Sequence, residues 1–267
     1  MTPSVTTHSI RKVLACLGLI VFAGALLVAF GGCGGVTTSP DGTAMTSTGG
    51  TASTPAYTSV TFGTDDGLCL GGRIYGRGAR GVVLAHMYPA DQTSWDGVAQ
   101  DLAAEGFFVL TFDFRGYGES EGAKDIQYLD RDVTAAVITL RQAGAEEIVL
   151  VGASMGGTAC LKSADQLQTL SSVRLAGVAT LSAPVQFQGL SAEEAVPRLQ
   201  IPLLFIAAEG DSGASGARDL QGLAGGRGTL VILPGSDHGT DLFAGSQAEE
   251  AWRLLLDFIQ ESMPTTI

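Results

Sequence analysis

Basic residues, histidines and paired cysteines are scarce in this chain of 267 residues. Fifteen lysines and arginines stand against 27 acidic residues, so the formal net charge is −12 at neutral pH. Nucleic acid and anionic lipid attract cationic surfaces, so this balance argues against charge-driven binding to either. Four cysteines, none in a C-x-x-C pair, exclude a disulfide scaffold and a cysteine-rich zinc site. No metal-ligand spacing and no phosphate-binding glycine loop occur, so the sequence predicts no metal and no cofactor.

The N-terminal segment differs in composition from the rest of the chain. Arg11 and Lys12 precede an uncharged apolar stretch, Val13–Phe30, and Cys33 follows two glycines. A basic start, an apolar run and small residues are typical of an export signal, and the cysteine resembles the lipidated residue of bacterial lipoproteins. An uncleaved membrane anchor is the alternative, because such a stretch nearly spans a bilayer. Both interpretations predict tethering to a bacterial membrane outside the cytoplasm, with Cys33 as the candidate lipidation site.

Composition also sets the expected domain boundaries. Residues 1–33 form the signal or anchor segment, and residues 34–56, rich in Thr, Ser and Gly, predict a flexible linker. Residues 57–267 are then the folded domain. A domain of about 210 residues buries roughly 70% of its chain surface, which is ample for a core.

Strand-like and helix-like segments alternate through this domain. The expected strands are Ser59–Phe62, Leu70–Tyr75, Gly81–His86, Phe107–Phe112, Glu147–Gly152, Leu175–Leu181, Pro202–Ala207 and Thr229–Leu233. The expected helices are Trp95–Glu105, Tyr128–Gln142, Gly156–Gln166 and Gln247–Glu261. This alternation predicts an α/β fold with a mainly parallel sheet of about eight strands and helices on both faces. The first two strands predict an antiparallel hairpin at one edge.

The most informative motif is G-x-S-x-G around Ser154, between an expected strand and an expected helix. Gly152 and Gly156 supply the small residues that a sharp strand-to-helix turn requires, and such a turn lifts the Ser154 hydroxyl above the sheet edge. The N–H of Met155 then points toward a developing oxyanion at the helix N-terminus. The motif predicts that Ser154 is a nucleophile.

A serine nucleophile needs a general base. The chain has three histidines: His8 lies in the leader, His86 ends a strand before the nucleophile, and His238 follows the last expected strand. A triad in the chain order serine, acid, histidine requires the C-terminal one. His238 is therefore the predicted base.

The acid that orients the histidine should follow the strand before the last one. Asp211 is the best candidate there, and Glu209 is its competitor. Asp237 and Asp241 flank His238, but neighbours so close in the chain cannot easily reach its ring Nδ1. The predicted triad is Ser154, Asp211 and His238.

Together these residues resemble the α/β-hydrolase superfamily, over essentially Tyr57 to Met263. Four segments carry the resemblance: residues 84–89 (LAHMYP), 112–120 (FDFRGYGES), 152–156 (GASMG) and 235–239 (GSDHG). The resemblance implies the α/β-hydrolase fold and a hydrolytic activity.

The resemblance also implies supporting roles. The family usually has His-Gly-x after its third strand, where x donates one oxyanion N–H, and here the segment reads His86-Met87-Tyr88. By this alignment the backbone N–H groups of Tyr88 and Met155 form the oxyanion hole, and His86 holds the loop by hydrogen bonding. Methionine in place of glycine departs from the family pattern. Arg115, in the D-x-R-G-x-G-x-S segment, is expected to fix a structural turn beside the site.

Many relatives insert a cap domain after the sixth strand. Here only residues 185–201 separate two expected strands, room for one helix over Ala192–Arg198. The sequence therefore predicts an open site without a large cap. The remaining domain cysteines are Cys69 and Cys160, and Cys160 is expected to act as a small buried hydrophobe.

The predicted function is a serine hydrolase that cleaves an ester of a small-molecule acyl substrate, as a carboxylesterase does. Peptidase, thioesterase and lipase activities use the same triad and stay open as alternatives. The resemblance assigns dehalogenase and epoxide hydrolase chemistry to an aspartate nucleophile, which Ser154 disfavours. A non-catalytic lipoprotein that binds a ligand is the competing class, and it predicts a broken triad. The sequence leaves the oligomeric state open.

Overall fold

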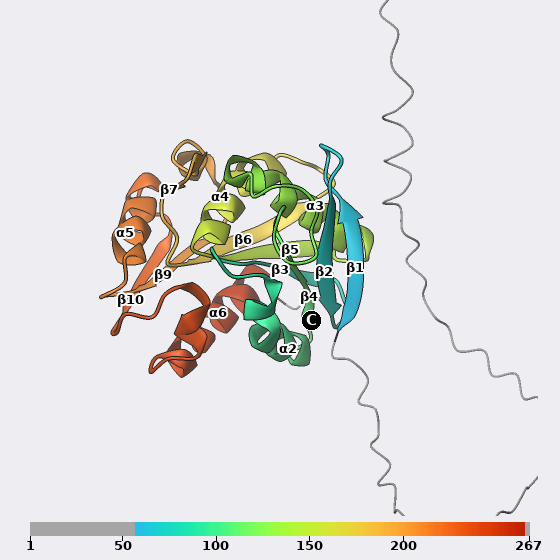
Figure 1. The fold of residues 1–267 in the computed structure, drawn as a ribbon. Coiled ribbons are helices and arrows are strands. Elements are labelled where there is room, and N and C mark those ends of the chain that lie inside the picture. The colour runs from blue at the N-terminus through green and yellow to red at the C-terminus, as the bar shows by residue number, and fades with distance from the viewer. Residues whose placement is uncertain (1–56, 265–267) are drawn as a thin grey trace, which may run out of the picture.

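The computed structural model describes residues 57–264. The expected signal or anchor segment, its Cys33 and the linker over residues 34–56 lie outside the described residues, as do residues 265–267. Within the described range, strands and helices alternate along the chain (Figure 1). None of the helices between residues 57 and 264 has both the length and the apolar character needed to cross a membrane.

Eight strands form one large sheet. They are β1 (Thr58–Gly63), β2 (Cys69–Tyr75), β3 (Arg80–Ala85), β4 (Phe108–Phe112), β5 (Glu147–Ala153), β6 (Arg174–Leu181), β9 (Leu203–Ala208) and β10 (Thr229–Leu233). Their order is β1-β2-β4-β3-β5-β6-β9-β10. Strand β2 runs antiparallel to both of its neighbours, and the pairs from β4 to β10 are parallel. The predicted parallel sheet with an antiparallel hairpin at its edge is confirmed.

Between residues 57 and 264, five α-helices and four short 3-10 helices accompany the strands. The α-helices are α2 (Asp96–Ala104), α3 (Leu129–Gln142), α4 (Met155–Leu167), α5 (Gly213–Leu223) and α6 (Ala248–Ser262). The 3-10 helices are η1 (Gln92–Trp95), η2 (Ile126–Tyr128), η3 (Val196–Arg198) and η4 (Gly239–Phe243). A two-stranded hairpin, β7 (Gln186–Phe187) with β8 (Leu190–Ser191), stands apart from the large sheet.

Helices cover both faces of the sheet, with α3, α4 and α5 on one face and α2 and α6 on the other (Figure 1). The central strands are buried on both faces, and their successive side chains enter two different cores. In β5, Ile148 and Leu150 pack in the first core, whereas Val149 and Val151 pack in the second. This explains why the central strands read as unbroken apolar runs, without alternation of polar and apolar residues.

The chain between β6 and β9 differs from the expectation. The predicted helix over Ala192–Arg198 is wrong: this part contains the β7–β8 hairpin and the short turn η3. Gln188 and Gly189 both have positive φ (46° and 88°), which is typical of a tight two-residue hairpin turn. Even so, this connection adds only a small hairpin, so the expectation of no large cap is confirmed.

Helix α5 is present in the structure and absent from the sequence prediction. Its sequence, GASGARDLQGL, contains three glycines, which are poor helix formers. The helix is held by packing, because Ala214, Ala217 and Leu220 are buried against the sheet. Tertiary burial therefore overrides weak local propensity here.

Candidate active site

Ser154 occupies the sharp turn between β5 and α4. Its backbone has φ 48° and ψ −117°, a strained conformation for a residue with a side chain, and its N–H donates to the Leu181 carbonyl at 2.7 Å. The flanking glycines permit this turn. A Cβ at Gly152 would lie 2.5 Å from the Gly156 backbone, and one at Gly156 would lie 2.6 Å from the His86 carbonyl oxygen. The serine is 7% exposed, at the carboxyl edge of the sheet.

Asp211 and His238 come together at the same edge. Asp211 follows β9, His238 follows β10, and the ring Nδ1–H donates to the carboxylate Oδ1 at 2.7 Å. The Asp211 side chain is 3% exposed, whereas that of His238 is 34% exposed. The competing Glu209 is exposed, and its backbone N–H pairs with the Leu233 carbonyl. Of the two acids, Asp211 is the one that reaches the histidine.

Ser154 and His238 are neighbours without being hydrogen-bonded. No hydrogen bond joins their side chains in the part of the chain that the structure describes. The two loops nevertheless touch, because a Cβ built on Gly239 would lie 3.4 Å from the Ala153 Cβ. Catalytic hydrogen bonds are often long before substrate binds. The structure thus places the histidine loop against the turn that carries the serine.

Ser182 is a site residue that the sequence prediction missed. It directly follows β6, is fully buried and has φ 57°. Its hydroxyl accepts a hydrogen bond from the Gly239 N–H at 3.0 Å and faces the Asp211 carboxylate. It therefore contacts both the histidine loop and the acid. The only signal in the sequence is its position after β6, because a lone serine is common in loops.

The surroundings of Asp211 favour its charged form. Burial is the largest single influence and acts to raise the pKa, but the Ser182 hydroxyl, His238 and the Gly213 N–H together lower it below its ordinary value. Asp211 is therefore an anion at neutral pH. An anion at this place fixes the Nδ1–H tautomer of His238, which leaves Nε2 free to accept a proton.

His86 has both ring nitrogens engaged in holding two loops. Its Nδ1–H donates to the Met87 carbonyl at 2.9 Å, and its Nε2 accepts from the Phe114 N–H at 3.1 Å. Burial lowers the pKa of this histidine. A neutral, fully bonded ring cannot act as a base, so His86 connects the loops after β3 and β4.

Met87 occupies the position where the resemblance led us to expect a glycine. Its sulfur lies 2.6 Å from the place that a Cβ on Gly239 would take, and the Thr240 hydroxyl lies 3.8 Å from it. The methionine therefore packs directly beneath the histidine loop. Gly239 has φ 58°, a left-handed conformation that favours glycine, and a side chain there would have to displace the thioether.

The two expected oxyanion donors belong to the start of α4 and to the loop after β3. Met155 begins α4, so its N–H has no acceptor within the helix. Tyr88 follows in the loop after β3, and the peptide bond between Tyr88 and Pro89 is cis. The α4 N-terminus contacts the end of β3, because a Cβ on Gly156 would collide with the Ala85 carbonyl. The start of the loop that carries Tyr88 is thus in contact with the start of α4.

Arg115 contacts none of the three proposed triad residues and instead joins neighbouring parts of the chain. It is 2% exposed and forms ion pairs with Asp132 at 2.6 Å and Asp66 at 2.9 Å. Burial acts to lower the pKa of Arg115, but the hydrogen bonds to these two carboxylates raise it. The arginine ties the loop after β4 to α3 and to the turn between β1 and β2.

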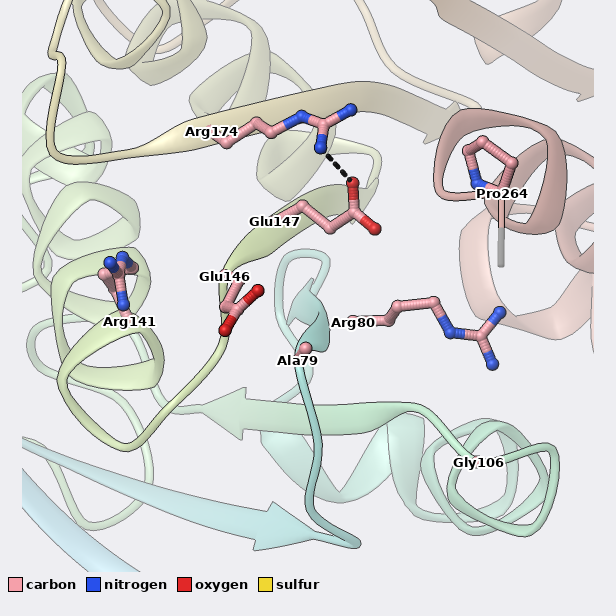
Figure 2. A pocket seen from close by; sticks show the side chains of 8 residues that line it. All are labelled: Ala79, Arg80, Gly106, Arg141, Glu146, Glu147, Arg174 and Pro264. Carbon is pink, nitrogen blue, oxygen red and sulfur yellow. Dashed lines mark ion pairs between the residues drawn. The ribbon is translucent and has the colours of Figure 1, made fainter. Parts of the chain in front are cut away.

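A cavity of about 610 Å³ lies at the opposite, amino-terminal edge of the strands. Figure 2 shows Arg174 paired with Glu147 there, with Arg80 and Arg141 nearby. None of the predicted site residues lines this cavity, so it is distinct from the candidate active site. Among residues 57–264, no three His, Cys, Asp or Glu side chains are grouped so that they could hold a metal ion.

Comparison with known proteins gives matches in sequence. A family model described as alpha/beta hydrolase fold matches residues 82–193. Epoxide hydrolase A of Mycobacterium tuberculosis is 35% identical over 127 residues, which are 47% of this chain and 35% of that protein. Bifunctional epoxide hydrolase 2 of Sus scrofa is 35% identical over 78 residues, 28% of this chain and 14% of that protein. The chain thus spans about a third or less of the length of these relatives.

Solved structures with the same fold cover more of the chain. An esterase of Pyrococcus furiosus superposes with a TM-score of 0.67 at 18% identity, over 77% of this chain and 90% of that one. A thermophilic esterase of Thermogutta terrifontis gives a TM-score of 0.62 at 19% identity, over 77% of this chain and 99% of that one. At such identities the likeness shows the shared fold.

Proposed function

Because the chain belongs to the α/β-hydrolase superfamily, we propose that it is a serine hydrolase that cleaves carboxylic esters. The observation that carries the proposal is the hydrogen bond between His238 and the buried Asp211, beside the strained turn of Ser154. Backbone strain of this kind persists where the surroundings enforce it, as in a nucleophile elbow.

The proposed reaction follows from this geometry. His238 Nε2 takes the proton of the Ser154 hydroxyl as its oxygen attacks the ester carbonyl. The N–H groups of Tyr88 and Met155 stabilise the negative charge that forms on the carbonyl oxygen. The imidazolium, held by the Asp211 carboxylate, then gives its proton to the departing alcohol. Water, activated by the same histidine, releases the acyl group from the serine.

The oxyanion donors and the acid are expected to contribute unequally to the rate of the proposed reaction. Losing one oxyanion donor typically raises the barrier by about 3 kcal/mol. Losing the charge on the acid leaves the histidine in the wrong tautomer and lowers kcat by a factor of about 10⁴. The low pKa of Asp211 supports the proposal because it keeps this charge in place at neutral pH.

Epoxide hydrolysis is the second candidate, since both sequence relatives carry that name. The nucleophile argues against it. The family resemblance assigns epoxide opening to a carboxylate, which forms an ester that water can cleave. An alkyl ether on Ser154 would resist that hydrolysis. Peptidase, thioesterase and lipase reactions use the proposed machinery unchanged and remain alternative substrates for it.

The location of the protein is part of the proposal. The basic start, the apolar stretch Val13–Phe30 and Cys33 support tethering to a bacterial membrane on its outer side. Cleavage before Cys33 with lipidation and retention of an uncleaved anchor both produce this arrangement. Mass spectrometry of the membrane-extracted protein distinguishes them, because only the first gives a mature chain that begins with a lipid-bearing Cys33.

The test uses the full chain and three forms of it: wild type, Ser154→Ala and Ser215→Ala. Ser215 is an exposed serine on α5 and serves as the matched control. We expect fluorophosphonate labelling and hydrolysis of p-nitrophenyl esters by wild type and by the control, and neither by Ser154→Ala. A panel of epoxides should give no diol.

Three results would contradict the proposal. Absence of labelling in folded wild type excludes an activated serine. Diol formation that survives in Ser154→Ala would point to an acid elsewhere and to the epoxide chemistry. Ligand binding that is equal in wild type and Ser154→Ala, without turnover of esters, thioesters or amides, would favour the non-catalytic lipoprotein.

A further inference from the structure

Two aromatic rings from distant parts of the chain meet on the loops that follow β3 and β6, two strands of the large sheet. Tyr88, in the loop after β3, and Phe187, in β7, have ring centroids 5.8 Å apart at an angle of 47°. Tyr88 is 46% exposed and Phe187 is half-buried. We call this pair the aromatic wall. A ring exposed to this degree on a rigid backbone offers apolar area that a ligand can cover.

The hairpin that carries Phe187 is fixed to the nucleophile helix. The Thr158 hydroxyl, on the first turns of α4, donates to the Pro184 carbonyl at 2.7 Å, and Leu190 anchors the hairpin in the core. The Ala192 N–H closes its base on the Val185 carbonyl at 2.9 Å. The aromatic wall is therefore held in place before any substrate binds.

Tyr117 connects the wall to the helix start. Its hydroxyl lies 4.0 Å from the Met155 sulfur, and its ring packs on His86 with centroids 5.0 Å apart. Burial raises the pKa of Tyr117, and the nearby Tyr88 adds to this effect. The phenol of Tyr117 is 4% exposed and forms the buried support beneath the exposed rings.

The aromatic wall and the methionine beneath the histidine loop pack on different faces of the sheet. Phe187, Tyr117 and Met155 belong to the core under α3 and α4, whereas Met87, beneath the histidine loop, belongs to the core under α2 and α6. The leaving oxygen must face His238 to receive its proton. The acyl group leaves the carbonyl carbon in another direction, and the rings near Met155 are available to receive it.

We infer that the aromatic wall of Tyr88 and Phe187 is the acyl-binding subsite and selects esters with a compact aromatic acyl group. The inference rests on the proposed serine hydrolase. A flat ring can pack against both aromatic faces in an offset or tilted arrangement. A long flexible chain would run past the short hairpin into solvent and gain little from it.

The experiment compares acyl groups with one leaving group, p-nitrophenol, so that the alcohol side is constant. The full chain is assayed on the acetate, butyrate, octanoate, cyclohexylacetate and phenylacetate esters. The variants are Phe187→Leu, which keeps apolar volume without the ring, and Phe187→Tyr, which keeps the ring. Ile138→Ala removes an exposed apolar side chain on α3 and is the matched control.

In wild type we expect the phenylacetate ester to have the highest kcat/KM of the series. Phe187→Leu should lower kcat/KM for phenylacetate about 3- to 10-fold, mainly through KM, and leave the acetate ester unchanged. Phe187→Tyr should keep the preference for the phenylacetate ester, and Ile138→Ala should behave as wild type.

Equal losses on acetate and phenylacetate, or a wild-type preference for octanoate, would overturn the acyl-subsite assignment while leaving the serine hydrolase intact. A preference for cyclohexylacetate equal to that for phenylacetate would overturn the requirement for a flat ring. Failure of every ester together with absence of Ser154 labelling would instead be the failure of the proposed function, and the inference would fall with it.

Discussion

Replacing Ser182 with alanine tests the least obvious part of the site. The change removes the acceptor of the Gly239 N–H, a bond of 3.0 Å, and the hydroxyl that faces Asp211. Because Ser182 is fully buried, water cannot take over either contact. The backbone keeps its positive φ of 57°, so strain there stays the same while the polar contact is lost.

The size of the effect follows from the lost partner. A buried donor left without an acceptor costs about 1–3 kcal/mol. The histidine loop can avoid this cost by moving so that the Gly239 N–H finds another acceptor, and His238 then leaves its productive position. A penalty of this size lowers kcat/KM about 5- to 150-fold, since about 1.4 kcal/mol corresponds to tenfold. The loss should appear in kcat, because Ser182 does not touch the proposed acyl subsite.

The pH profile separates positioning from general stability. Ser182 helps to lower the pKa of Asp211, so the variant's carboxyl should take up its proton at a higher pH. The charge on Asp211 is present above its pKa and is lost as pH falls through it. Protonation of Asp211, which removes the charge that orients His238, should therefore begin at a higher pH in Ser182→Ala, so activity at low pH should be lost earlier than in wild type.

Two further variants sharpen this prediction. Ser182→Gly removes the same hydroxyl and relaxes the backbone, so it should show the same earlier loss of activity at low pH with a smaller loss of thermal stability. Ser215→Ala should match wild type. The reasoning is refuted if folded Ser182→Ala keeps the kcat of wild type and loses activity at the same low pH when both are assayed between about pH 3 and 9.

Three other predictions concern packing and ionisation. Gly156→Ala should lower the free energy of unfolding, measured in urea, by about 1–3 kcal/mol, because the new Cβ meets the Ala85 carbonyl. Gly222→Ala, in open space on α5, should raise this free energy by up to about 1 kcal/mol. Equal effects of the two changes would contradict the packing argument. Burial lowers the pKa of His86, so below about pH 6.5 the unfolded state binds a proton that the folded state does not bind. The melting temperature should therefore decrease as the pH is lowered below about 6.5, and His86→Gln should make the melting temperature depend less on pH. Burial raises the pKa of the free Cys160 thiol, so iodoacetamide should modify it only after unfolding, and rapid modification of native protein would disprove its burial.

Elements that depend on local pattern could be predicted from the sequence. The unbroken apolar runs of the central strands and the spacing of apolar residues in α3 and α6 place these elements within a few residues of their observed bounds. The G-x-S-x-G segment identifies the turn at Ser154, because only small neighbours permit that backbone. Helix α5 could not be predicted, since its glycines oppose helix formation and only burial against the sheet stabilises it.

Chain order alone favoured Asp211 over Glu209 without deciding between them. The two acids are two residues apart, and the choice depends on which carboxyl meets a histidine 27 positions away. Ser182 and Gly239 are 57 positions apart, and nothing in the local sequence around either one indicates their contact. The same holds for Met87 beneath the histidine loop and for Phe187 against Tyr88.

By itself, then, the sequence determined the class of fold, the nucleophile candidate and the scarcity of alternatives to His238. These depend on period, spacing and residue type, which are properties of neighbours along the chain. The tertiary structure decided which acid pairs with the histidine, that Ser182 connects them, and which rings stand beside the serine. Those contacts form only when the carboxyl ends of β3, β6, β9 and β10 are brought to one edge of the sheet, and strand order is set by packing on both faces.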